Sequence, residues 1–246
     1  MDYRIIIIVL IASFMSGCGN VNERKNDSKL SLVTTTGMIE DALKNIVKDS
    51  AEVKALMGPG VDPHLYKATQ GDLERLTSAD AIFYNGLHLE GKMGEIFGKL
   101  GARKPVIAVA DNIDTTKLKS APNYGYAIDP HVWFDVSLWT EAVETAKKAM
   151  QEIDKENATF YEQNAQDYIS QLNELHIWVK NEISQIPDNQ RILITAHDAF
   201  GYFGEAYNIE VRGLQGISTL SEYGLKDVSD LVNFIVNNKI KAVFVE

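Results

Sequence analysis

Apolar residues in the first half of the chain form short segments in which a strand-like pattern and a helix-like pattern alternate. Runs rich in β-branched and other apolar residues predict strands, at 30–36, 53–57, 81–86 and 105–110. Between them, apolar positions spaced three or four apart predict helices, at 37–47, 71–79 and 91–100. This alternation is typical of βαβ units and predicts an α/β fold with a parallel sheet. In such sheets ligands bind beyond the carboxyl ends of the strands.

The pattern then changes to one long helical stretch. A helix is expected over 137–153, and from Tyr161 to Ile186 apolar positions again recur every three or four residues. Pro187 ends this second pattern. The stretch predicts a single helix of roughly thirty residues, longer than most globular helices, that acts as a stiff connector.

Strand and helix patterns resume after the connector. Strands are expected at 191–197, 209–216 and 241–246, and helices are expected through Phe200–Tyr207 and at 225–238. We therefore predict an N-terminal lobe at 30–156, a connecting helix at 157–187 and a C-terminal lobe at 188–246. A buried parallel strand normally has a covering helix after it, so we expect this second lobe to be truncated.

The start of the chain is typical of an export signal. Residues 1–17 contain Arg4 and then an apolar run from Ile5 to Met15, too short for a permanent membrane helix. The residues Met-Ser-Gly-Cys resemble a bacterial lipoprotein box, which implies cleavage before Cys18 and lipidation of its sulfur. The alternative is an ordinary buried cysteine. Residues 18–29 then form a polar tether, and we expect an extracytoplasmic, lipid-anchored protein.

Composition and charge narrow the function classes. The chain has 246 residues, 45% hydrophobic and 24% charged, which is ordinary for a globular protein. Its net charge of −10 argues against binding to nucleic acid, because no basic stripe is present to neutralise phosphates. No glycine-rich phosphate loop and no nucleophile elbow occurs, so nothing in the sequence demands catalysis.

Three of the five histidines share a context. The tripeptide Asp-Pro-His ends at His64 and again at His131, and His197 ends a predicted strand. A proline fixes its own backbone and extends the residue before it, so each tripeptide presents its histidine rigidly. Three neutral imidazoles and one further ligand would suit a four-coordinate zinc-type site. The alternative is that each histidine has only a structural role.

Residues near the three histidines have several possible roles. Asp62, Asp129 and Asp135 either accept a hydrogen bond from a ligand's second ring nitrogen or stabilise turns. We expect Trp133 and Phe134 to exclude water around the site and Trp139 to lie on the buried face of the next helix. We expect His88 to be structural and His176, on the long helix, to face solvent.

Several longer segments resemble one known family. They are GPGVDPHLYKATQGDLERLTSADAIFYNGLHLEGKM, DPHVWFDVSLW, LITAHDAFGYFGEAYNIEVRGLQGIST and KAVFVE. In order, and over nearly the whole mature chain, these segments resemble the zinc/manganese solute-binding proteins of bacterial ABC transporters, the cluster A-I type. The resemblance implies two α/β lobes joined by one long rigid helix. It implies that His64, His131 and His197 bind Zn²⁺ or Mn²⁺ between the lobes for delivery to a cognate ABC permease.

The sequence departs from the family pattern at its end. The family's fourth ligand is an aspartate in a segment beyond the strand that ends here at Glu246. We expect three protein ligands and an open position, with Glu246 a weak candidate to replace the fourth. Histidine at the third position resembles the zinc or mixed zinc/manganese branch, since more imidazole favours zinc.

Two other functions stay open at this point. One is a metal-dependent hydrolase with a three-histidine site, which would need a general base that the sequence does not clearly supply. The other is a surface adhesin of the same family. We expect a monomeric binding protein rather than an enzyme.

Overall fold

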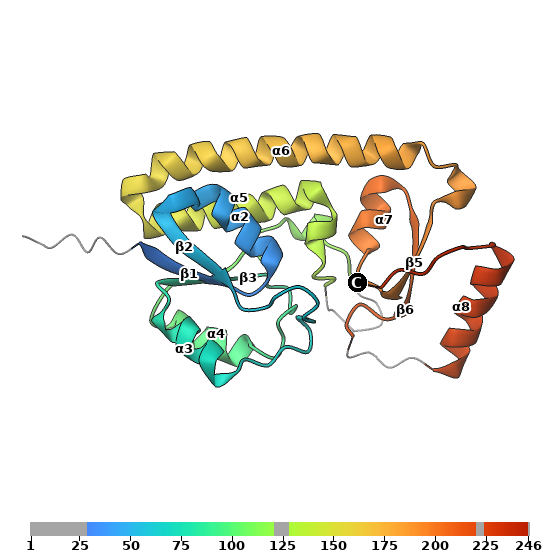
Figure 1. Cartoon of the computed structure of the whole chain (residues 1–246), viewed down its shortest axis with the longest axis horizontal. Coiled ribbons are helices and arrows are strands. Elements are labelled where there is room, and N and C mark those ends of the chain that lie inside the picture. Colours follow the sequence, from blue (N-terminus) through green and yellow to red (C-terminus); the bar gives the residue numbers. More distant parts are fainter. Residues whose placement is uncertain (1–28, 121–127, 220–223, 246) are drawn as a thin grey trace, which may run out of the picture.

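The computed structural model describes residues 29–120, 128–219 and 224–245 (Figure 1). The predicted signal peptide and the lipidation site Cys18 lie outside the described residues, as does Glu246. Among the residues described, no helix has the length and apolar character needed to cross a bilayer.

A four-stranded parallel sheet forms the centre of the N-terminal lobe. Its strand order is β2-β1-β3-β4. The strands are β1 (Leu30–Thr34), β2 (Ala51–Ala55), β3 (Ala81–Tyr84) and β4 (Val106–Ala108). The helices are α2 (Gly37–Val47), α3 (Gln70–Ser78), α4 (Gly94–Gly101) and α5 (Val136–Ile153). Chain connections leave β1 and β3 in opposite directions, which is the kind of switch point where α/β sheets bind ligands.

Both faces of the two central strands, β1 and β3, are buried, because their alternate residues enter two different cores. Leu32 and Phe83 join the core formed with α2 and α5, while Val33 and Ile82 face the core formed with α3 and α4. The apolar runs that form β1 and β3 are therefore strands covered by helices on both sides. Trp139 is buried in the first core, as expected.

The long helix predicted from the sequence is confirmed as α6 (Ala158–Ser184), which ends before Pro187. It packs against α2 and α5 in the N-terminal lobe and against α7 in the other lobe, so it spans both (Figure 1). Tyr161, Ala165 and Leu172 are buried on its inner face. His176 was expected to face solvent but is only partly exposed, and its Nδ1 lies 3.1 Å from the hydroxyl of Tyr207 on the facing helix of the other lobe.

In the part that the structure describes, the C-terminal lobe contains two paired parallel strands and two helices. They are β5 (Ile192–His197), α7 (Gly201–Tyr207), β6 (Glu210–Gln215) and α8 (Leu225–Asn237). The two-lobe α/β fold with parallel sheets and a long connecting helix is confirmed, while the domain limits 30–156, 157–187 and 188–246 stay predictions.

The strand predicted at 241–246 does not form as expected. Within the described part, Phe244 makes only an isolated parallel bridge to Thr195, beside β5. The side chains of Val243, Phe244 and Val245 are 52%, 55% and 81% exposed. Their high β propensity is therefore not matched by burial, which is what stabilises a strand of a parallel sheet.

Candidate metal centre

The first Asp-Pro-His loop follows β2 and presents His64. The Oδ1 atom of Asp62 accepts a hydrogen bond from the backbone N–H of His64 at 2.8 Å, which closes a tight turn. The Oδ2 atom of Asp62 accepts from the hydroxyl of Thr219, in the other lobe, at 2.6 Å. Asp62 therefore stabilises the turn, one of its two expected roles, and also links this loop to the C-terminal lobe.

The second Asp-Pro-His loop holds His131 more tightly. The Oδ1 atom of Asp129 lies 3.0 Å from the backbone nitrogen of His131 and 2.7 Å from its Nδ1. Both residues are buried, at 1% and 2% exposure. A carboxylate acceptor at Nδ1 fixes the proton there and leaves the Nε2 lone pair free for a cation. Asp129 therefore has the expected role of orienting a histidine ring.

The remaining candidate aspartate has a different partner. Asp135 accepts hydrogen bonds from the backbone N–H and the hydroxyl of Ser137 and caps the start of α5. Of its two expected roles, turn stabilisation is the one confirmed.

His197 comes from the other lobe, at the last position of β5. It is 9% exposed and pairs in register with Gln215 of β6. A Cβ on Gly213 of β6 would lie 2.5 Å from the backbone nitrogen of Asp198. The backbone therefore approaches closely beside the histidine, and glycine at 213 is what permits this approach.

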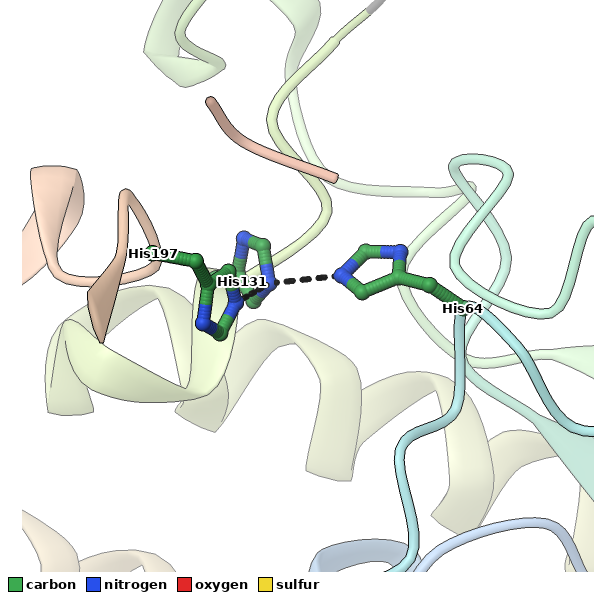
Figure 2. Close-up of side chains that lie close together, drawn as sticks. All are labelled: His64, His131 and His197. Carbon is green, nitrogen blue, oxygen red and sulfur yellow. Dashed lines mark hydrogen bonds between the residues drawn. The ribbon is translucent and has the colours of Figure 1, made fainter. Parts of the chain in front are cut away.

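The three rings meet between the lobes with their Nε2 atoms facing one another (Figure 2). The Nε2 atom of His131 lies 3.1 Å from that of His64 and 3.4 Å from that of His197. All three ligand atoms lie within 4.8 Å of one another. Tetrahedral zinc with Zn–N bonds of about 2.0–2.1 Å requires N···N separations of about 3.3–3.4 Å. The two separations from His131 are close to this value.

Burial keeps the imidazole of His64 neutral. Burial and, second to it, the neighbouring His131 lower the pKa of His64 from 6.5 to about 4. A neutral imidazole offers a lone pair and does not repel an incoming cation. Among the described residues, the group of converging ligand atoms contains no carboxylate.

Aromatic rings pack beside the cluster. The ring of Trp133 lies 5.2 Å from that of His131, and Phe134 stacks on Phe200 with ring centroids 4.1 Å apart. Trp133 packs against His131 as expected, and Phe134 packs on Trp133 and Phe200. That these rings exclude water stays a prediction. His88 lies outside the cluster, exposed and with a positive φ of 65°.

The sequence did not reveal the buried polar residues that support the second loop. Asn85 donates from Nδ2 to the carbonyl of Pro130 at 3.0 Å. Its own backbone N–H donates to Glu90 at 2.8 Å, and Glu90 also accepts from the hydroxyl of Thr35 at 2.6 Å. The Asn-Gly pair signals a turn in the sequence, but nothing there shows that the asparagine side chain reaches a loop 45 residues away.

Comparisons with known proteins agree with this architecture. Residues 32–246 match the family model described as ZnuA, Zinc-uptake complex component A periplasmic. The chain is 46% identical over 248 residues to the Manganese-binding lipoprotein MntA of Bacillus subtilis, covering 100% of this chain and 81% of that protein. It is 44% identical over 246 residues to the Zinc-binding protein TroA of Treponema pallidum, covering 99% of this chain and 79% of that one.

Solved structures show the same fold. The periplasmic zinc binding protein TroA of Treponema pallidum superposes with a TM-score of 0.85 at 46% identity, covering 89% of this chain and 78% of that chain. The AdcAII protein of Streptococcus pneumoniae, at 23% identity and a TM-score of 0.79, shares the fold. Because the family model matches most of this chain, residues 32–246, the chain belongs to the ZnuA family of zinc-uptake complex component A proteins.

Proposed function

We propose that this protein is the substrate-binding component of an ABC importer that captures a divalent transition metal with His64, His131 and His197. The observation that carries the proposal is the spacing of the three buried Nε2 atoms, 3.1 Å and 3.4 Å from the central one. One cation placed between the three Nε2 atoms would accept a lone pair from each imidazole.

Zn²⁺ or Mn²⁺ is the proposed cargo. The relatives named above include a manganese-binding and a zinc-binding protein. Three imidazoles favour zinc, because manganese prefers carboxylate and water oxygens. Since the ligands come from both lobes, the arrangement of the lobes controls how well the ion is held.

The proposal includes a location and partners. Relatives are named lipoproteins of metal ABC transporters. Together with the lipoprotein-like residues ending at Cys18, this supports a lipid anchor on the outer face of a membrane, where a cognate permease receives the ion. The proposed receptor acts as a monomer.

Binding is favoured over catalysis. The hydrolase alternative needs a free general base beside a metal-bound water. The carboxylate nearest the cluster, that of Asp129, is already engaged with His131 at two positions. The family relatives of this protein are named as uptake or binding proteins, which also disfavours the hydrolase. These names give no support to an adhesin as the main role.

Metal content and affinity test the proposal. The protein from Gly19 onward is loaded, desalted and measured by mass spectrometry, and then titrated with Zn²⁺ and Mn²⁺ against a chromophoric chelator. We expect about one equivalent of zinc. His131→Ala should weaken binding by more than about 100-fold, because loss of a ligand exceeds the roughly 10–100-fold effects of residues behind the ligands.

A matched histidine control keeps this test specific. His88 is exposed and has a left-handed backbone, which asparagine tolerates, so His88→Asn should bind metal as the wild type does. Unchanged affinity in His131→Ala, or an equal loss in His88→Asn, would contradict the site.

A further inference from the structure

One helix of the C-terminal lobe reaches the residue that orients His131. Tyr202 lies in α7 and is 2% exposed. Its hydroxyl donates to the backbone carbonyl of Asp129 at 2.9 Å and accepts from the backbone N–H of Lys119 at 3.0 Å. Burial raises the pKa of Tyr202, so the hydroxyl keeps the proton that it donates.

The two backbone groups that meet the hydroxyl are themselves joined. The N–H of Asp129 donates to the carbonyl of Lys119 at 2.9 Å. Tyr202 therefore closes a small ring of hydrogen bonds made from Lys119, Asp129 and its own hydroxyl. Every group in this ring is satisfied, so the ring holds Asp129 at a fixed distance from α7.

A second contact between α7 and Asp129 is independent of the hydroxyl. A Cβ on Gly201, the first residue of α7, would lie 3.1 Å from the Oδ2 atom of Asp129. The helix backbone therefore packs directly on the carboxylate whose other oxygen contacts the Nδ1 of His131 at 2.7 Å. A shift of α7 must move this carboxylate, and with it the ring of His131.

From these contacts we propose that Tyr202 is a positioning residue of the metal centre. Its hydroxyl transmits the placement of α7 to Asp129 and so aims His131 at the incoming ion. The arrangement of the lobes and the geometry of the site are then set by the same hydrogen bonds. This inference rests on the proposed function, in which His131 is a ligand.

The variant Tyr202→Phe tests the proposal, because it keeps the buried ring and removes only the hydroxyl. Tyr207→Phe is the matched control: Tyr207 is on the same helix and 4% exposed, and its hydroxyl lies 3.1 Å from Nδ1 of His176 on α6. Affinity for Zn²⁺ is measured by chelator competition, and the visible absorption of bound Co²⁺ reports the coordination geometry.

We expect Tyr202→Phe to weaken Zn²⁺ binding about tenfold and to alter the Co²⁺ spectrum, as changes behind metal ligands do. Tyr207→Phe should lower thermal stability but leave both metal readouts at the wild-type values. If Tyr202→Phe fails to fold, Gly201→Ala replaces it and must alter the Co²⁺ spectrum.

The outcomes separate this inference from the proposed function. Wild-type affinity and spectrum in Tyr202→Phe, or equal losses in both tyrosine variants, would overturn the positioning role and leave the three-histidine site standing. A wild-type protein that binds no metal would overturn both.

Discussion

Asp129→Asn is the substitution that best tests how the second loop works. The change keeps the size of a side chain that is 1% exposed, but removes its charge. The amide can still accept at Oδ1, but it no longer stabilises the proton on Nδ1 of His131 through a charged acceptor. If the amide turns over, its N–H₂ faces Nδ1, the ring proton moves to Nε2, and that proton points at the metal.

The size of the effect follows from the two contacts of this carboxylate. It lies 2.7 Å from the ring nitrogen and 3.0 Å from the backbone nitrogen of His131. A hydrogen bond to a charged group contributes about 1.5–3 kcal/mol. Losing the charge on the ring contact should therefore cost about 2 kcal/mol of metal binding, or about 30-fold in Kd.

Chelator competition with Zn²⁺ measures this change directly. Asp135→Asn is the matched control, because it makes the same change in net charge a few residues away, at a helix cap where asparagine works as well as aspartate. An Asp129→Asn Kd within twofold of the wild type would refute the reasoning. So would an equal loss in Asp135→Asn, which would mean that only overall charge matters.

Three further predictions concern stability. The pKa of His64 falls from 6.5 to about 4 on folding. The free energy of unfolding of the metal-free protein should therefore decrease by about 3 kcal/mol as the pH drops from about 6.5 through 4. In urea titrations, the His64→Gln variant should show a smaller decrease over the same pH range. Gly213→Ala should destabilise the fold by at least about 1–3 kcal/mol, because the new Cβ would lie 2.5 Å from the backbone of Asp198. Gly98→Ala, which has open space around it, should stabilise the fold by about 0.5–1 kcal/mol. A reversed order of the two denaturant midpoints would contradict this packing. Free Zn²⁺ at 100 times its Kd should stabilise the fold by about 2.7 kcal/mol, an effect that a chelator should remove; an unchanged melting temperature would argue against a folded-state site.

Much of this fold is predictable because local pattern and tertiary burial agree. The central strands β1 and β3 of the first sheet are apolar on both faces and the structure covers both. The edge strand β2 instead exposes Glu52 and Lys54. The long helix shows the helical period over its whole length and ends before Pro187. The segment at 241–246 shows the limit, because its β propensity is high while Val245 is 81% exposed. Propensity alone does not say whether another layer covers a strand.

The site was predictable only in part for a similar reason. Strand ends and proline-fixed loops indicate where His64, His131 and His197 are presented, and the sheet topology brings them together. The two Asp-Pro-His tripeptides are identical in sequence, yet Asp62 reaches Thr219 while Asp129 reaches the ring of His131. Such differences depend on contacts between residues far apart in the chain, which no local pattern encodes.

X-ray absorption at the zinc edge tests the central claim most directly. The protein is loaded with one equivalent of Zn²⁺, and the fine structure is compared with that of the His131→Ala variant. The account predicts three imidazole nitrogens at about 2.0–2.1 Å in the wild type and one fewer in the variant. A wild-type spectrum without imidazole scattering, or one that His131→Ala leaves unchanged, would contradict it.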